Sequence, residues 1–298
     1  MKEFIYIILL LMITAVSGNA QPFNKEVTTS NNRSLLLGKI NKQGLSQAPY
    51  GQWFQKNYNQ YAPKKDVIET IKNQLNQYTI TVFMGTWCGD SKREVPAFYK
   101  VLDSLNFPAE RITVVAVNNE RNFYKQSPGG EHEGLNIHRV PTFIFYKDSK
   151  EVNRIVESPK ATLEEDILQI VSNKYISNYS SVTAIDEILK EHDQDYLFKK
   201  SKKLISEFKE KTQNMYELNT YANVLFFAHK YEEAIAVLKF NLMLFPEEAN
   251  AHVSLANKYL YLNDETNAIK YYEKSLKFAD NEEIQSKIKE LRIASNQE

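Results

Sequence analysis

The chain has 298 residues, which is long enough for two domains, and its 37 lysines and arginines equal its 37 aspartates and glutamates. With no net charge, the chain as a whole has no field that would attract nucleic acid or an acidic membrane surface, so neither is an expected partner. A single cysteine excludes an intramolecular disulfide. Packing must therefore hold the fold, and Cys88 is either a reactive thiol or a vestige.

Residues 1–20 have the pattern of a secretory signal peptide. Lys2 precedes an apolar run over 5–13, and the small residues Gly18 and Ala20 stand before the expected cleavage position. The run is short for a membrane span, and no cysteine near the cleavage position indicates a lipid anchor. An uncleaved membrane anchor is the alternative. We expect an exported protein, periplasmic or extracellular, with no stable membrane span.

The next segments lead from a polar tail into the first helices. Residues 21–34 are polar and without periodicity, so we expect a disordered segment or tether. Aromatic residues at nearly helical spacing then predict a short helix packed on the main domain, at Trp53, Phe54, Tyr58 and Tyr61. Pro63 is expected to begin a second helix that ends near Leu75 and has one apolar face.

A strand, a turn and a helix are predicted around the cysteine. Residues 79–83 are rich in β-forming side chains, and a stretch with helical character covers 92–105. The turn between them contains Cys88, which therefore stands at the start of a helix. There, free backbone N–H groups and the positive end of the helix dipole favour a thiolate.

Three further elements complete the predicted domain. The apolar run over 111–118 predicts a buried central strand, 141–146 and 151–156 predict a hairpin, and 162–171 predicts a closing helix. Thr162 would cap that helix in a capping box with Glu165. The connection over 118–136 is long and polar, which makes it a candidate specificity loop.

These features resemble the thioredoxin superfamily, whose members carry Trp-Cys-Gly-Pro-Cys at this junction, a helix-kinking proline eight residues after the first cysteine and a later cis-proline before a strand. This chain has Trp87-Cys88-Gly89-Asp90-Ser91, then Pro96, and later Val140-Pro141-Thr142 before an apolar run. The resemblance implies an α/β thioredoxin-like fold over 35–173. It also implies a cis Val140–Pro141 bond that exposes backbone groups to an extended substrate strand.

Two working parts of dithiol thioredoxins are absent. Ser91 occupies the position of the resolving cysteine, and Val82 occupies that of the buried acid. A chain with one thiol cannot close its own disulfide, which excludes a dithiol disulfide reductase. Two interpretations stay open. One is a monothiol thiol–disulfide oxidoreductase that forms mixed disulfides with exported proteins or peptides, and the other is a redox-inactive interaction module or assembly scaffold.

Cys88 is the candidate for the chemistry, and its neighbours would modify the sulfur. Ser91 would donate a hydrogen bond to the thiolate, and the charge of Asp90 disfavours the anion. The family geometry implies that Arg139 lies near the sulfur and offsets Asp90; a surface role is the alternative. The candidate catalytic residues are Cys88, Ser91, Trp87, Pro141 and Arg139, and the candidate substrate contacts beside them are Gly89, Asp90 and Val140.

No metal or cofactor is expected. His132 and His138 lie close together in the sequence, but no ligand spacing supports a metal site, and we interpret them as solvated loop histidines. Residues 92–94 are expected to form a solvated helix face.

The C-terminal third is entirely helical in pattern and repeats with a period of 34 residues, as from Ala222 to Ala256 and from Ala234 to Ala268. It resembles tetratricopeptide (TPR) repeats. The resemblance implies an all-α TPR helical-repeat domain at 215–298, formed by two repeats and a capping helix. The period fails upstream, so 174–214 is either a helical bridge or a divergent cap.

The repeats contain a candidate peptide site. Asn223 and Asn257 occupy the same position one period apart, on the helix that lines the concave groove in this family. Paired asparagines hold a peptide backbone by donating and accepting hydrogen bonds together. We expect a TPR-bound polypeptide there.

Overall fold

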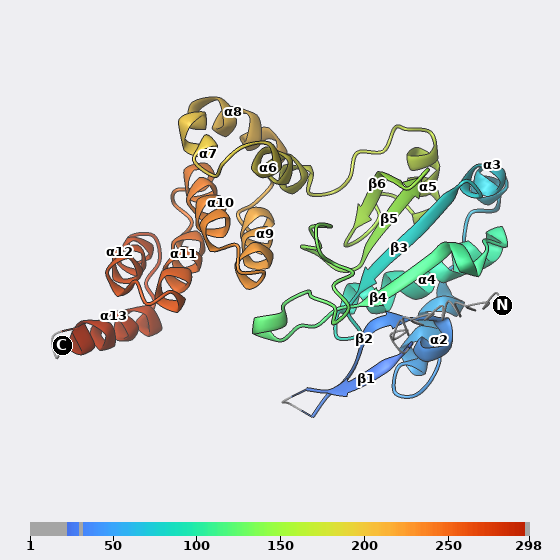
Figure 1. Ribbon diagram of the computed structural model, residues 1–298, viewed down its shortest axis with the longest axis horizontal. Coiled ribbons are helices and arrows are strands. Elements are labelled where there is room, and N and C mark those ends of the chain that lie inside the picture. The colour runs from blue at the N-terminus through green and yellow to red at the C-terminus, as the bar shows by residue number, and fades with distance from the viewer. Residues whose placement is uncertain (1–22, 30–31, 296–298) are drawn as a thin grey trace, which may run out of the picture.

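The computed structural model describes residues 23–29 and 32–295 and shows a sheet-containing part and a helical part in contact (Figure 1). The expected signal peptide, residues 1–20, lies outside the described residues. Across the described ranges, no helix combines the length and apolar character needed to cross a bilayer.

The sheet has six strands in the order β1-β2-β4-β3-β5-β6. Only β3 and β4 pair in parallel; the other neighbours are antiparallel. The strands are β1 (Lys25–Thr28), β2 (Ser34–Ile40), β3 (Tyr78–Met84), β4 (Ile112–Ala116), β5 (Thr142–Lys147) and β6 (Lys150–Val156). The predicted active-site strand, central strand and hairpin are therefore confirmed.

The sheet extends further toward the N-terminus than the sequence indicated. We expected 21–34 to be disordered, and this is wrong at Lys25–Thr28, which pairs antiparallel with β2. The strand is mostly exposed and therefore lacks the apolar alternation by which a strand is recognised. As an edge strand it needs only one hydrogen-bonding neighbour, which the buried β2 supplies.

Helices cover one face of the sheet. The face with Ile80, Val82 and Met84 packs on the helices in one apolar cluster. The main helices of this layer are α2 (Gly51–Gln60), α3 (Lys65–Leu75), α4 (Gly89–Leu105) and α5 (Leu163–Val171). Of the short helices, α1 (Lys42–Leu45) follows β2, η1 (Ala109–Arg111) precedes β4, and η2 (Arg121–Phe123) lies in the 118–136 connection and contacts α9 (Tyr216–Phe227). All four predicted helices are present. Thr162 caps α5 by accepting a hydrogen bond from the Glu165 N–H.

The opposite face of the sheet is covered by loop. Phe83, Val115 and Ile144 form a second apolar cluster there with Ile137 and Val140, which follow the 118–136 connection. Alternate residues of β3 thus face the helices on one side of the sheet and the loop on the other, as expected for a strand buried on both sides. The segment after the connection is thus part of the core, and Leu135 at the end of the connection packs against it.

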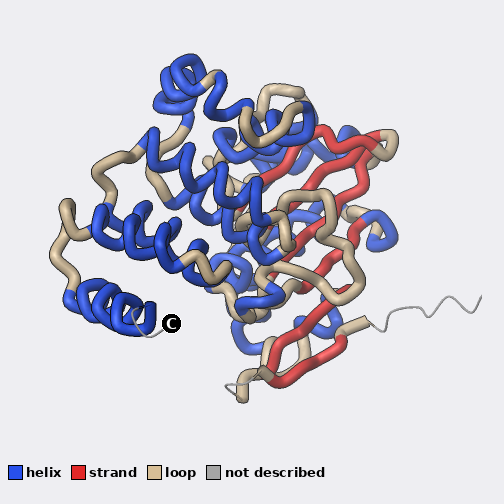
Figure 2. Tube along the Cα trace, turned by 60° about the vertical axis from the view of Figure 1, so that its left-hand side comes forward, coloured by secondary structure: helices blue, strands red, loops and turns tan. Residues whose placement is uncertain are grey.

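The C-terminal part consists of stacked helices (Figure 2). Its helices are α6 (Ser180–Glu191), α7 (Tyr196–Lys199), α8 (Ser201–Lys211), α9 (Tyr216–Phe227), α10 (Tyr231–Leu244), α11 (Ala249–Tyr261), α12 (Glu265–Ser275) and α13 (Glu282–Ser295). Helices α9 and α10 form one pair and α11 and α12 the next. Ala222 and Ala256 are fully buried, as small residues are where helices cross closely. The predicted all-α repeat architecture is present.

Helices α6 to α8 pack on the first repeat. Val182, Ile185 and Leu204 share one apolar cluster with residues of α9 and α10. A buried hydrogen bond of 2.6 Å, from the Ser181 hydroxyl to Glu217, joins α6 to α9. Within 174–214, the helices thus pack on the first repeat, and the choice between a helical bridge and a divergent cap stays a prediction.

The two parts meet through the 118–136 connection and the segment before α6. Gln126 Nε2 donates a hydrogen bond of 2.7 Å to the carbonyl of Phe227 at the end of α9. The rings of Tyr124 and Phe227 pack edge to face with centroids 6.3 Å apart. On the other side, Tyr179 donates a hydrogen bond to Glu157 at the end of β6.

Candidate functional site

Cys88 is the N-cap residue of α4, in extended backbone conformation. Its carbonyl accepts the first helical hydrogen bond, from the Lys92 N–H at 3.1 Å. The tight turn before it requires Gly85, because a Cβ there would lie 2.4 Å from the Trp87 ring. The side chain of Cys88 is half-buried. The strand, turn and helix therefore place the sulfur at the helix start, where the sequence predicted it.

The sulfur faces the segment that precedes β5. Cys88 Sγ donates a hydrogen bond of 3.2 Å to the carbonyl oxygen of Val140, and the Val140–Pro141 bond is cis, as the resemblance implied. The hydrogen bond exists only while the sulfur carries its proton. In the described residues, the Val140 N–H has no hydrogen-bond acceptor. The thiol thus lies beside a Val140 carbonyl that already accepts a hydrogen bond and a Val140 N–H that has no acceptor among the described residues.

Ser91 does not bond to the sulfur. Its hydroxyl oxygen is fully buried and accepts a hydrogen bond of 3.1 Å from the Gly85 N–H, and no bond to Cys88 occurs among residues 23–29 and 32–295. The expected hydrogen bond to the thiolate is therefore wrong. One helical turn after the cap, the hydroxyl points back to the end of β3 and stabilises the turn.

The charges around the helix start pair with each other. Arg93 contacts Asp90 at 2.8 Å and Glu94 at 2.6 Å. Glu94 is buried, which raises its pKa despite the opposing effect of Arg93. The expectation of a solvated face over 92–94 therefore fails at Glu94. Gly89 is exposed, and a Cβ there would meet no atom within 4 Å, so the side of the helix start next to the sulfur is open.

Arg139 does not pair with the sulfur or with Asp90, so the expectation that its charge offsets that of Asp90 beside the thiol is not met. Its guanidinium forms an ion pair of 2.8 Å with Glu157 and lies 4.9 Å from the Tyr179 ring centroid. It is partly buried at the junction between the two parts, so the surface role is not observed either. Trp87 packs in the cluster beside Cys88 and donates a hydrogen bond of 2.9 Å to the Val117 carbonyl.

Lys125 is a residue that sequence reasoning missed. It is buried, and its ammonium group donates a hydrogen bond to the His138 carbonyl, two residues before Val140. Burial, then the charge of Arg139, lowers its pKa to about 7, whereas the charge of Cys88 acts in the opposite direction. A lysine in a polar loop gives no sequence signal of burial. Only the fold reveals that this loop anchors the backbone that contacts the thiol.

His138 is not solvated, contrary to our interpretation. It is 4% exposed, and burial lowers its pKa to about 3. Its Nδ1 lies 3.2 Å from the Asn136 carbonyl, which accepts only from a protonated nitrogen, so Nε2 is the unprotonated one. His132 is half-buried and accepts a hydrogen bond from the Ser127 N–H. Within the described part of the chain, no cluster of three or more potential metal ligands occurs.

The two asparagines of the repeats have different surroundings. Asn257 accepts a hydrogen bond of 2.6 Å from the Tyr272 hydroxyl, inside the second repeat. The side-chain amide of Asn223, in α9, makes no hydrogen bond to any described residue. The structure thus leaves one of the two amides fully available and engages the oxygen of the other.

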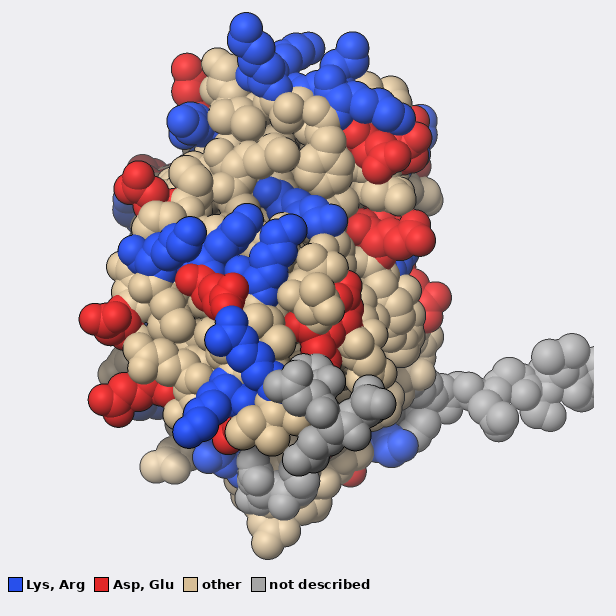
Figure 3. Space-filling view, turned by 90° about the vertical axis from the view of Figure 1, so that its left-hand side faces the viewer, with Lys and Arg blue, Asp and Glu red and all other residues tan. Residues whose placement is uncertain are grey.

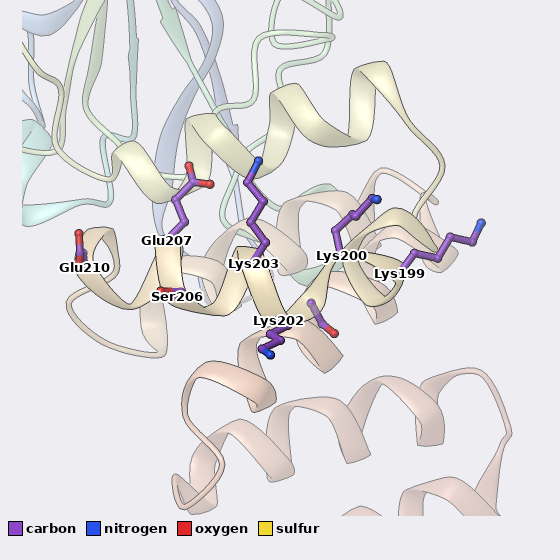
Figure 4. Close-up of a pocket in the computed structure, with 8 residues that line it drawn as sticks. Lys199, Lys200, Lys202, Lys203, Ser206, Glu207 and Glu210 are labelled. Atoms are coloured by element: carbon purple, nitrogen blue, oxygen red, sulfur yellow. The ribbon is translucent and has the colours of Figure 1, made fainter.

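A lysine-rich surface covers α7 and α8, at the top of Figure 3. It borders a cleft of about 750 Å³ lined by Lys199, Lys200, Lys202 and Lys203. In Figure 4, Lys202 points away from Lys203, and Lys199 points outward at the end of the cleft. The four ammonium groups therefore do not converge on one ligand position.

Comparisons with known proteins agree with this architecture. A thioredoxin family model, Thioredoxin_9, matches residues 46–169, which excludes β1 and β2. A TPR repeat-containing thioredoxin TDX from Arabidopsis thaliana is 30% identical over 101 residues, which cover 34% of this chain and 24% of that protein. The chain thus matches about a quarter of that relative's length. The protein contains a thioredoxin-like domain followed by TPR-like helical repeats.

Proposed function

We propose that the protein is an exported, periplasmic or extracellular thioredoxin-like protein whose only thiol, Cys88, reacts with disulfides of partner polypeptides. The observation that carries the proposal is the position of the sulfur, half-exposed at the start of α4 and 3.2 Å from the Val140 carbonyl. The signal pattern of residues 1–20 supports export.

The reaction is a monothiol exchange. Cys88 loses its proton to solvent, and its sulfur attacks one sulfur of a partner disulfide. The new Cys88–partner disulfide forms as the partner's own S–S bond breaks, and the other partner sulfur leaves as a thiolate. Ser91 cannot resolve this mixed disulfide. A second thiol from outside, a low-molecular-weight thiol, attacks the partner sulfur, forms a disulfide with it and regenerates Cys88 as the leaving thiolate.

Backbone pairing would hold the partner during exchange. The unoccupied N–H of Val140 offers one main-chain hydrogen bond to an extended strand beside the thiol, and deprotonation of Cys88 frees the Val140 carbonyl for a second. The helical repeats would supply a separate polypeptide-binding surface, with Asn223 free to donate and accept.

The test compares the native thiol with the same thiol in the unfolded chain. Purified protein is mixed with glutathione disulfide, and the mixed disulfide is followed by mass spectrometry. We expect one adduct at Cys88, formed at least about tenfold faster in the native protein than in urea, because the fold holds the sulfur beside the Val140 backbone groups that can pair with the peptide groups of glutathione. Cys88→Ala should form none. An equal or slower native rate would overturn the proposal.

One observation favours a second function, a redox-inactive binding module. The sulfur packs in an apolar cluster with Phe83 and Val115, and it already donates a hydrogen bond to the Val140 carbonyl. This alternative predicts that Cys88→Ala captures the same partners as the native protein. Loss of those partners in the variant would favour the monothiol function.

A further inference from the structure

Two cations at the junction of the parts have no anionic partner among residues 23–29 and 32–295. Lys258 on α11 is 7% exposed, and its Nζ lies 4.5 Å from the ring centroids of both Phe226 and Phe227. Arg121 on η2 lies over the Tyr261 ring, 5.5 Å from its centroid. Neither cation makes an ion pair or a side-chain hydrogen bond within the described residues.

This arrangement costs stability in the free protein. Burying an ammonium group without a counter-ion is unfavourable, and aromatic rings compensate only in part. Burial, followed by the charge of Arg121, lowers the pKa of Lys258 to about 8. The two cations therefore repel each other, and an anion between them would remove that repulsion.

The ammonium group of Lys258 is within reach of a ligand. It has no hydrogen-bond partner, yet it is not among the fully enclosed unpartnered atoms, in contrast to His138 Nε2. Arg121 is exposed. A ligand can thus contact both groups without opening the fold.

The cations lie on the same side of the molecule as the thiol. Arg121 lines a cleft of about 410 Å³ together with Trp87, the neighbour of Cys88. Tyr124 contacts Phe227 and lies close enough to Cys88 for the charge of a Cys88 thiolate to raise the pKa of the Tyr124 hydroxyl. Figure 1 shows the loop that carries η2 reaching toward α9. A polypeptide that enters this cleft would therefore lie against Arg121 and against Trp87, the neighbour of the reactive residue.

We infer that Arg121 and Lys258 bind the carboxylate of an acidic side chain on the partner polypeptide whose sulfur reacts at Cys88. The inference rests on the proposed function and adds the chemistry of the substrate. A guanidinium group binds a planar carboxylate through two parallel N–H donors, and the ammonium group supplies a third contact. The preferred partner carries aspartate or glutamate near its reactive cysteine.

The test uses two synthetic peptides that differ only in side-chain charge. Each has one cysteine activated as a 2-pyridyl disulfide, three flanking residues on either side that are all glutamate or all glutamine, and blocked termini. Cys88 attacks the cysteine sulfur of the peptide, and pyridine-2-thione leaves and is followed by its absorbance. The blocked C-terminus restricts the result to side-chain carboxylates.

We expect the glutamate peptide to react about tenfold faster than the glutamine peptide at low ionic strength, and the preference to shrink with added salt. Arg121→Gln and Lys258→Gln should each remove most of the preference, whereas Lys258→Arg should keep it. Arg121 is exposed, so its variant tests the site even if Lys258→Gln does not fold. Lys202→Gln, an equal charge change on α8, is the matched control and should behave as the native protein.

A small uncharged reagent, 2,2′-dithiodipyridine, separates the two possible failures. Every folded variant should react with it at the native rate. If the native thiol reacts no faster than in the unfolded chain, the proposed function fails. If it reacts normally but shows no preference for the glutamate peptide, or if the Arg121 variant keeps the preference, the carboxylate site alone is overturned.

Discussion

His138 shows how strongly one buried side chain couples this fold to pH. Its ring packs edge to face on Tyr179 and carries its proton on Nδ1. Protonating Nε2 would place a charge where no described group accepts a hydrogen bond from it. The fold therefore holds the neutral imidazole, whereas the unfolded chain takes up a proton at the ordinary pKa.

The first prediction concerns acid stability. Because the pKa of His138 is about 3 in the fold and 6.5 ordinarily, its contribution is complete above pH 6.5 and is lost as the pH falls toward 3. The expected loss is about 1.4 kcal/mol per pH unit in that window. Urea titrations from pH 7 to pH 4 should show a shallower loss in His138→Gln than in the native protein. If the free energy of unfolding fell with pH at the same slope in both proteins, the burial of a neutral His138 ring would be contradicted.

The second prediction is that replacing Lys258 stabilises the fold. Its pKa is lowered from 10.5 to about 8, so the charged form weakens the fold below pH 8, and stability recovers as the pH rises toward 10.5. Lys258→Met should raise the free energy of unfolding at pH 7 by on the order of 1–3 kcal/mol. Thermal unfolding at pH 7 and pH 10 measures this, and the gain should be smaller at pH 10. A destabilised variant at both pH values would disprove it.

At the scale of elements, the turn between β3 and α4 is the part best described by sequence. Its strand, glycine, cysteine and helix occur within about twenty residues, so local propensity and spacing suffice to predict them. The role of Ser91 was mispredicted because its partner, the Gly85 N–H, belongs to the preceding strand end. Side-chain direction at a helix start depends on what precedes the helix.

The third prediction restores a second thiol at this turn. Ser91→Cys places two cysteines three residues apart across the helix start. Excess glutathione disulfide should then convert both thiols to one intramolecular disulfide, and the variant should lose two hydrogens while each reagent molecule is reduced to two molecules of glutathione. Mass spectrometry and thiol titration check this, with Ser104→Cys on the same helix as the control that cannot close. Loss of the hydrogen bond to Gly85 should cost about 1 kcal/mol of stability.

The 118–136 connection and strand β1 were poorly described by their sequences. Both are polar, and both become ordered through partners distant in the chain: β1 pairs with β2, and Lys125 bonds to the His138 carbonyl. Polar composition predicts exposure only when no other segment satisfies the polar groups. Whether another segment does so depends on the tertiary structure and cannot be read from the local sequence.

At the scale of the whole molecule, one ion pair lies where the two parts meet. Glu157 accepts from Arg139 and from Tyr179, and the Tyr179 ring lies against the Arg139 guanidinium. This network ties the segment before Pro141 to the start of α6. The geometry beside the thiol is thereby linked to the position of the repeats.

The fourth prediction tests that link. Glu157→Gln leaves Arg139 with no charged partner, and removing one member of a partly buried pair should lower the local opening free energy by about 1–2 kcal/mol. Hydrogen exchange should become roughly 5- to 30-fold faster at the start of α6 and around Val140, and stay unchanged in β3. Glu110→Gln, an exposed control, should change neither region. Unchanged exchange around Val140 would show that the network does not hold that segment.

The sequence by itself determined the thioredoxin-like core around Cys88, the lack of a second thiol, the Val140–Pro141 segment and the 34-residue helical period. Each of these depends on residues close together in the chain or on strict periodicity. The tertiary structure alone decided the pairing of Arg139 with Glu157, 18 residues away, and the contact of Gln126 with Phe227, 101 residues away. It also placed Arg121 near enough to Lys258 for the charge of one to act on the other. Charge partners are chosen by proximity in space, and proximity in space is fixed only when the whole chain packs.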